Sequence, residues 1–62
     1  MDVKKPLTDR EAGRVMTVLE QVDGKRLLLR QLRGFSPEEI SKNHGLKAED
    51  IARMAGRKPV SQ

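Results

Sequence analysis

Apolar residues recur at intervals of three and four along the first third of the chain, as they do on one face of an α-helix. They are Ala12, Val15, Met16, Leu19 and Val22. Thr8 and Glu11 precede this stripe with the spacing of a capping box, in which each side chain satisfies a free backbone amide at the start of a helix. The pattern predicts a helix over residues 8–22. Gly13 and several β-branched residues weaken its intrinsic propensity, so tertiary packing must hold it.

A second apolar segment is crowded with leucines. They are Leu27, Leu28, Leu29 and Leu32. We expect a helix over residues 25–33, which Asp23 caps and after which Gly34 takes the left-handed conformation. Three consecutive leucines are too many for one narrow stripe. Either this helix is buried on two sides, or the first or third leucine of the triplet faces a partner subunit.

The clearest helix start lies in the second half of the chain. Ser36 is a favoured cap, Pro37 suits the first helical position, and Glu39 completes a second capping box. This third helix should end near His44, where Gly45 tolerates the positive φ of a tight turn. A fourth helix should follow over about residues 48–55.

These last two helices meet the requirements of a pair that crosses steeply. A small residue is needed inside the first helix, and Ser41 provides it four positions before Gly45. Apolar residues must fill the inside of the crossing, and the leucine-rich helix must support it from the other side. The apolar residues are Ile40, Leu46, Ile51 and Met54.

Residues 34–54 resemble the helix-turn-helix superfamily of DNA-binding domains. The run Gly34-Phe35-Ser36-Pro37-Glu38-Glu39-Ile40-Ser41 is similar to the Gly-hydrophobic-Ser-x-x-Glu-Ile-Ala pattern of sigma-factor region 4 and of response-regulator output domains. The resemblance implies that the last helix lies in the DNA major groove. Its matching outward positions are Lys47, Ala48, Glu49, Ala52 and Arg53.

The resemblance also implies how this surface contacts duplex DNA. Arg53 would pair with guanine, and the alanines would touch thymine methyl groups. The groups that would position phosphates are Lys42, Arg57, Lys58 and the amide end of the third helix at Ser36. The net charge of +4 suits a polyanion, because residues 24–35 carry four cations and no acid.

The expected fold is therefore all-α. We expect a compact four-helix domain over residues 8–56, whose last two helices form a helix-turn-helix. A flexible arm over residues 1–7 should precede it, and a flexible basic tail over residues 57–62 should follow. The expected function is transcriptional regulation by binding duplex DNA, in a bacterium or phage.

A protein-binding module of the same fold is the alternative. Glu49 and Asp50 place two acids in the first turn of the last helix, where they repel phosphate. Such a module could inhibit the transcription machinery, or act as an antitoxin or a phage-type regulator, without binding DNA. Residues 8–32 could form a homodimer contact, because a small recognition unit usually binds as a dimer. Alternatively, the first helix simply completes a monomer core.

The sequence offers little support for other classes of function. The chain has no cysteine and one histidine, so it cannot build a disulfide or a thiolate metal site. It has no glycine-rich phosphate loop and no nucleophile–base pair, so we expect neither enzyme activity nor a cofactor. No apolar run approaches the ~20 residues of a membrane span, and the first residues do not read as a signal peptide. We therefore expect a cytoplasmic protein.

Overall fold

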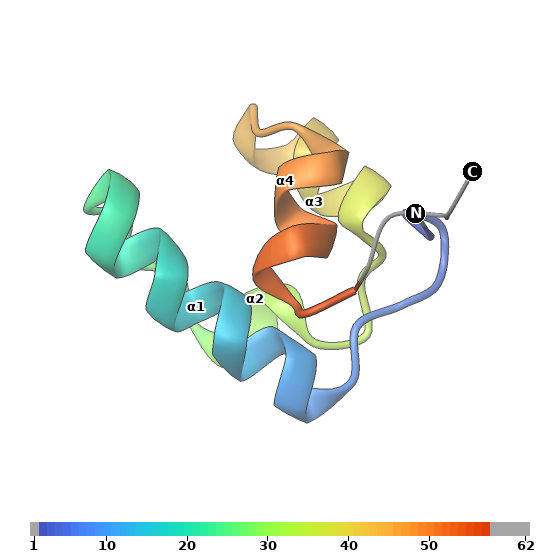
Figure 1. Cartoon of the computed structure of the whole chain (residues 1–62), viewed down its shortest axis with the longest axis horizontal. Coiled ribbons are helices and arrows are strands. Elements are labelled where there is room, and N and C mark those ends of the chain that lie inside the picture. The colour runs from blue at the N-terminus through green and yellow to red at the C-terminus, as the bar shows by residue number, and fades with distance from the viewer. Residues whose placement is uncertain (1, 58–62) are drawn as a thin grey trace.

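The computed structural model describes residues 2–57, and within that range it contains four helices and no strand (Figure 1). The helices are α1 (Asp9–Asp23), α2 (Leu29–Leu32), α3 (Pro37–His44) and α4 (Ala48–Met54). The expected all-α class is confirmed, and the bounds of α1, α3 and α4 lie within a residue or so of those predicted.

The capping box at the start of α1 is present as predicted. The amide of Glu11 donates to the Thr8 hydroxyl oxygen at 3.2 Å, and the amide of Thr8 donates to the Glu11 carboxylate at 3.0 Å. The helix ends where Gly24 adopts a left-handed conformation with φ 68°. The predicted stripe is shorter than expected, because Val22 in the last turn is 71% exposed.

The leucine-rich helix is the element that the sequence pattern predicted wrongly. Residues 24–28 are not helical, and α2 is a single turn. Asp23 belongs to α1 and does not cap a helix of its own. The amide of Leu28 donates to the Gln31 side chain at 2.7 Å, which starts α2 four residues later than expected. Leu28 is 53% exposed, whereas the outer two leucines of the triplet pack against the core.

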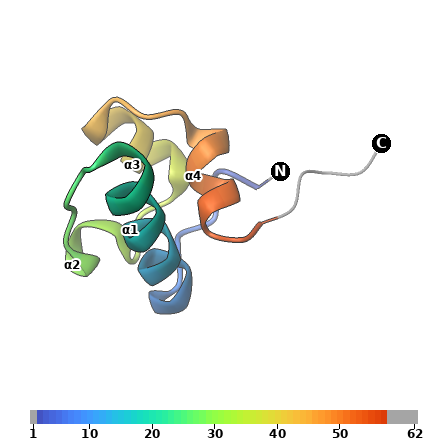
Figure 2. The same ribbon diagram turned by 60° about the vertical axis from the view of Figure 1, so that its left-hand side comes forward.

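The core lies where α1 meets the other helices. Figure 2 places α1 between α2 and α4, and both helices contact it, while α3 packs against α4. One cluster of buried apolar residues joins all four helices. It consists of Leu7, Ala12, Val15, Leu19, Leu32, Ile40, Ile51 and Ala55.

Both ends of the described chain take part in this packing. Leu7, expected in a flexible arm, is only 2% exposed and belongs to the core cluster. Its amide donates to the Phe35 carbonyl at 2.9 Å, and its own carbonyl accepts from the Gly34 amide at 3.0 Å. Arg57, expected in a flexible tail, is hydrogen-bonded to the N-terminal segment. The rest of the expected tail, including Lys58, lies outside the described residues.

Candidate nucleic-acid interface

The start of α3 is closed by its own capping groups. The amide of Glu39 donates to the Ser36 hydroxyl at 3.2 Å, and the amide of Ser36 donates to the Glu39 carboxylate at 3.0 Å. Pro37 has no amide hydrogen, and the amide of Glu38 donates to the Val3 carbonyl at 3.0 Å. These bonds argue against the expectation that this helix end binds a phosphate through Ser36, because the donors of its first turn are already used.

The turn between α3 and α4 is built around Ser41 and Gly45, as the spacing predicted. The Ser41 carbonyl accepts from the amides of Gly45 at 2.9 Å and Leu46 at 3.2 Å. The Ser41 hydroxyl in turn donates to the Leu46 carbonyl. Gly45 has φ 68°, and a Cβ there would meet nothing within 4 Å. The glycine is thus required by backbone conformation and not by lack of space.

The inner side of α4 differs from the one that the resemblance implied. Ala52 was expected to face DNA, yet it is 0% exposed, like Ile51 beside it. Ala48 lies one turn earlier on the same side and is half-buried. The alanines face inward because they flank the isoleucine on one helix face, where their small side chains let α4 approach its neighbours closely. Ala52 is thereby excluded as a base contact.

The outer side of α4 carries charged residues of both signs. Glu49 and Arg53 are exposed, and Lys47 is exposed just before the first turn. The Arg53 guanidinium lies 3.8 Å from the Asp50 carboxylate, and the two side chains are 63% and 50% exposed. An exposed pair at this distance contributes little to stability, so the arginine can exchange its partner for another acceptor.

A second group of cations borders the end of α3. Lys42 is exposed in the last turn of that helix. The Lys25 ammonium donates to the His44 carbonyl at 3.2 Å, which brings the cation-rich segment 24–35 beside the turn. His44 is half-buried there. Exposed lysines thus lie in the last turn of α3 and just before α4, and Lys25 contacts the end of α3.

Arg57 is occupied inside the fold and does not extend toward a ligand. Its Nε and Nη2 donate to the two carboxylate oxygens of Glu11 at 2.8 and 2.9 Å. Its terminal nitrogens also donate to the carbonyl oxygens of Lys5 at 2.8 Å, Pro6 at 3.1 Å and Asp2 at 3.2 Å. Its side chain is 11% exposed. These bonds argue against the phosphate contact expected at this residue, because its donors are used within the chain.

The Arg57 bonds also shift the titration of their partner. The guanidinium lowers the pKa of Glu11 from 4.5 to about 2, against the opposing effect of burial. The pKa of Arg57 is raised by the same pairing. Local sequence patterns assigned Glu11 to the cap alone, because nothing in them connects two residues that lie 46 positions apart.

Comparison with known proteins identifies no relative of this chain. No family model matches the chain, and neither does any curated protein or solved structure. Within residues 2–57, acidic side chains and the histidine form no group of three that could hold a metal ion. None of the helices in that range is both long and apolar enough to cross a membrane.

Proposed function

We propose that the chain binds duplex DNA with the outer side of α4, as a small helix-turn-helix regulator of transcription that acts in the cytoplasm. One observation carries this proposal. The helices α3 and α4 are packed together through the Ser41 and Gly45 turn, and the outer side of α4 is left exposed between flanking cations. A short exposed helix on a fixed support is the arrangement that a major groove accepts.

The proposal needs fewer DNA-contacting residues than the resemblance implied. Arg53 pairs with a guanine edge after releasing Asp50, and Glu49 accepts from a cytosine amino group. Lys42 and Lys47 contact phosphates on either side of the helix. The proposed contact set is thus smaller than the one implied by the sequence.

A selection of binding sequences from a random duplex pool tests the proposal. Fluorescence anisotropy would then measure the affinity of the selected duplex over a range of salt concentrations. Arg53→Ala should cost ~1–3 kcal/mol and relax preference at one position, because a bidentate base contact is lost. Lys47→Ala should weaken all sequences about equally and reduce the salt slope by ~1.

Arg26→Ala is a matched control for the loss of an exposed arginine outside α4, because its side chain is 87% exposed and lies 3.9 Å from Glu20 of α1. Its affinity for DNA should be closer to that of the unchanged chain than the affinities of Arg53→Ala and Lys47→Ala are. If Arg53→Ala and Lys47→Ala behave no differently from this control, the assignment of α4 is wrong.

A protein-binding module without DNA affinity is the second candidate, and the charge of α4 favours it. The outer side of that helix carries as many acids as cations, Glu49 and Asp50 against Lys47 and Arg53. Such a module would dock on a transcription-machinery protein. Absence of binding to random duplex DNA at low salt would favour this candidate, since phosphate contacts are strongest there.

A homodimer through residues 8–32 belongs to the same proposal. Val22 and Leu28 are 71% and 53% exposed, and both lie within that range. The exposed leucine is the middle one of the triplet, not one of the outer two. Sedimentation of the unchanged chain and of Leu28→Glu would test this contact: a loss of dimer is expected, and a monomer at all concentrations contradicts it.

A further inference from the structure

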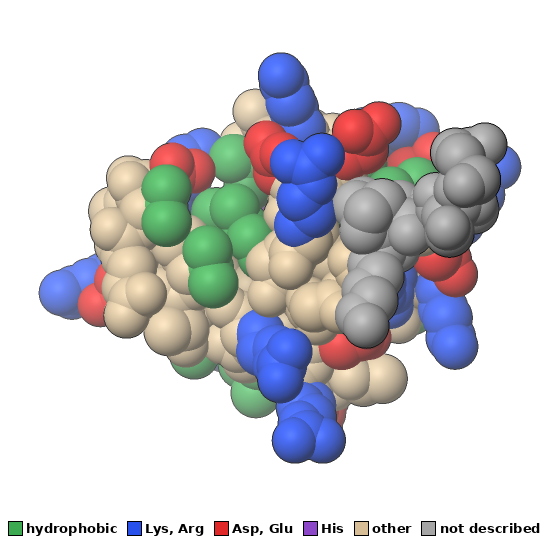
Figure 3. Space-filling view, in the orientation of Figure 1, with side chains coloured by type: hydrophobic (Ala, Val, Ile, Leu, Met, Phe, Trp, Pro, Cys, Tyr) green, Lys and Arg blue, Asp and Glu red, His purple; other side chains and the backbone are tan. Residues whose placement is uncertain are grey.

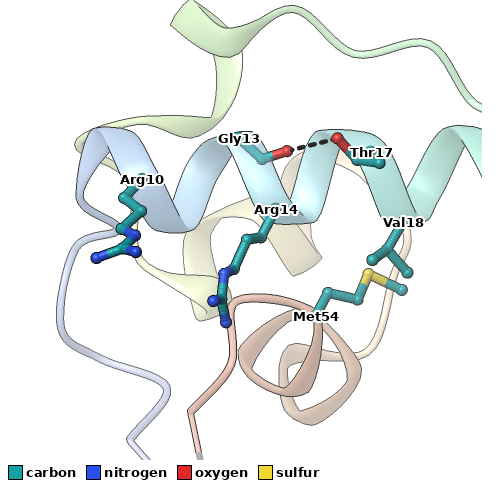
Figure 4. A pocket seen from close by; sticks show the side chains of 6 residues that line it. All are labelled: Arg10, Gly13, Arg14, Thr17, Val18 and Met54. Carbon is teal, nitrogen blue, oxygen red and sulfur yellow. Dashed lines mark hydrogen bonds between the residues drawn. The ribbon is translucent and has the colours of Figure 1, made fainter.

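A shallow, open groove lies between α1 and α4. Figure 3 shows apolar and basic side chains on the face of the molecule that these helices form. The groove is lined by Arg10, Gly13, Arg14, Thr17, Val18 and Met54 (Figure 4). Val18 and Met54 lie side by side, are half-buried and form its apolar part. The two arginines extend along the other part of the groove. No acidic residue lines it.

Gly13 has no role inside the described fold that would require a glycine. It lies in the middle of α1, where glycine costs roughly 0.5–1 kcal/mol relative to alanine. A Cβ there would meet nothing within 4 Å. The Thr17 hydroxyl donates to the Gly13 carbonyl at 3.0 Å, so the neighbouring polar group is satisfied within the helix. The missing side chain leaves room for another backbone to approach closely.

Arg10 and Arg14 give the groove a positive edge. They are four residues apart on one helix, where like charges repel and slightly weaken the helix. Neither makes an ion pair with another residue in the range 2–57. Carboxylates on a ligand would relieve this repulsion. An anionic group of a partner would therefore bind favourably beside the two arginines. An apolar group would bind favourably on Val18 and Met54.

We propose that this groove docks an acidic amphipathic helix of a partner protein. Its apolar side chains pack on Val18 and Met54, its backbone passes close to Gly13, and carboxylates one turn apart face Arg10 and Arg14. Helices with apolar anchors one turn apart are a common ligand for a groove of this kind. The proposal does not depend on DNA binding by α4.

Two other occupants fit the groove less well. A nucleic-acid backbone would satisfy the arginines but would leave the apolar part facing phosphates. A second copy joined through the same groove by a two-fold axis would place like surfaces together. Each copy would then bring two arginines and no acid, so the pair would repel.

Selection from a displayed library of random helical peptides, with the whole chain as bait, tests the proposal. Enriched peptides should combine apolar residues one turn apart with acids on one edge. Synthetic versions, labelled with fluorescein, would then be titrated with each variant. Gly13→Gln should weaken binding at least tenfold because it fills the groove. Gly13→Ala is the control for helix stability, and both should unfold no more easily than the unchanged chain.

A charge exchange locates the acidic contact. Arg10→Glu should weaken the selected peptide, and replacing the facing glutamate of the peptide by lysine should restore binding to this variant. Arg53→Ala should bind the peptide normally, which separates this site from the DNA surface of α4. The proposal is overturned if no peptide is enriched, if Gly13→Gln binds unchanged, or if the chain instead associates with itself through the groove.

Discussion

The two helices of the candidate interface differ in how they start. α3 begins at a capping box with Pro37 in the first turn, and it ends at the left-handed Gly45. α4 follows Lys47, whose side chain makes no capping bond. After its last turn, Gly56 adopts a left-handed conformation with φ 88°, and the amide of Arg57 donates to the Ala52 carbonyl at 3.0 Å. Both helices thus end at a left-handed glycine, but only α3 has a side-chain cap at its start, so the start of α4 depends on contacts with the rest of the chain.

This difference matters for the proposed function because α4 is the helix assigned to DNA. Its seven residues are too few for a stable isolated helix. Ile51 and Ala52 fix its rotation, and Arg57, just after its end, ties it to α1. Its outer side is thus aligned by the core and by one arginine. Changes that weaken these contacts should disturb α4 more than α3.

The largest effect is expected from Ile51→Ala. The side chain is fully buried in the cluster that joins the helices, so its truncation should lower the free energy of unfolding by roughly 2–5 kcal/mol. Val22→Ala is the control, because that valine is 71% exposed. Chemical denaturation would compare the two. Similar losses in both variants would contradict the view that packing holds α4.

Arg57→Ala should come next, with a loss on the order of 2 kcal/mol, because it leaves the partly buried Glu11 without its partner. Arg57→Lys should recover only part of this, since an ammonium cannot reproduce the paired bonds of a guanidinium.

The same pair predicts a dependence on pH. The pKa of Glu11 is lowered from 4.5 to about 2 in the folded chain, so the pairing stabilises the fold above the higher value. This contribution should disappear as the pH falls from about 5 toward 2, when the carboxylate is protonated. The free energy of unfolding should fall less steeply with decreasing pH in Arg57→Ala than in the unchanged chain. An identical acid profile in both chains would rule out this pair as its source.

Ser36→Ala tests the local signals of α3 and should cost about 1 kcal/mol, the usual value for a lost cap. The effect should be smaller than that of Ile51→Ala, although Ser36 is also buried, at 4% exposed. Thermal unfolding followed by circular dichroism would rank the two. A larger loss of stability in Ser36→Ala than in Ile51→Ala would contradict this difference between the two helices.

The smallest expected effect is a gain from Lys47→Ser. The residue already has the extended backbone of a cap, with φ −83° and ψ 130°, so a serine hydroxyl should add about 0.5–1 kcal/mol to the stability. The same change removes a proposed phosphate contact, so the variant should be more stable yet bind DNA less tightly. The melting temperature measures the stability and anisotropy measures the affinity for DNA. A variant in which both rise, or both fall, would contradict this prediction.

The sequence predicted what depends on neighbouring residues. The spacing of Thr8 and Glu11, the cap at Ser36 and the glycine at position 45 each act over a few residues, and each is found as predicted. Leu27, Leu28 and Leu29 are ambiguous because leucine suits a helix and an apolar cluster equally. The extended backbone at Leu28 follows from the fold around it.

The candidate site was harder to predict, because side chains of α4 can be assigned only once its inner face is known. Ala52 suits either side of a helix, and its burial is decided by close packing. The bonds of Arg57 to Glu11 connect distant parts of the chain, which no local pattern encodes. The exposed positions of Lys47, Glu49 and Arg53 agree with the expectation, while their contact with DNA stays a prediction.

The hydrogen bonds of Arg57 to the carbonyls of Asp2, Lys5 and Pro6 also bear on synthesis. A ribosome adds the arginine more than fifty residues after each of those three. The nascent chain can form α1, the cap of α3 and the bond from Glu38 to Val3 on the way, but the bonds to Arg57 cannot form until position 57 has left the exit tunnel. A chain that stops before position 57 would therefore keep the bonds of Val3 and Leu7 but lose the link between the N-terminal segment and the end of α4.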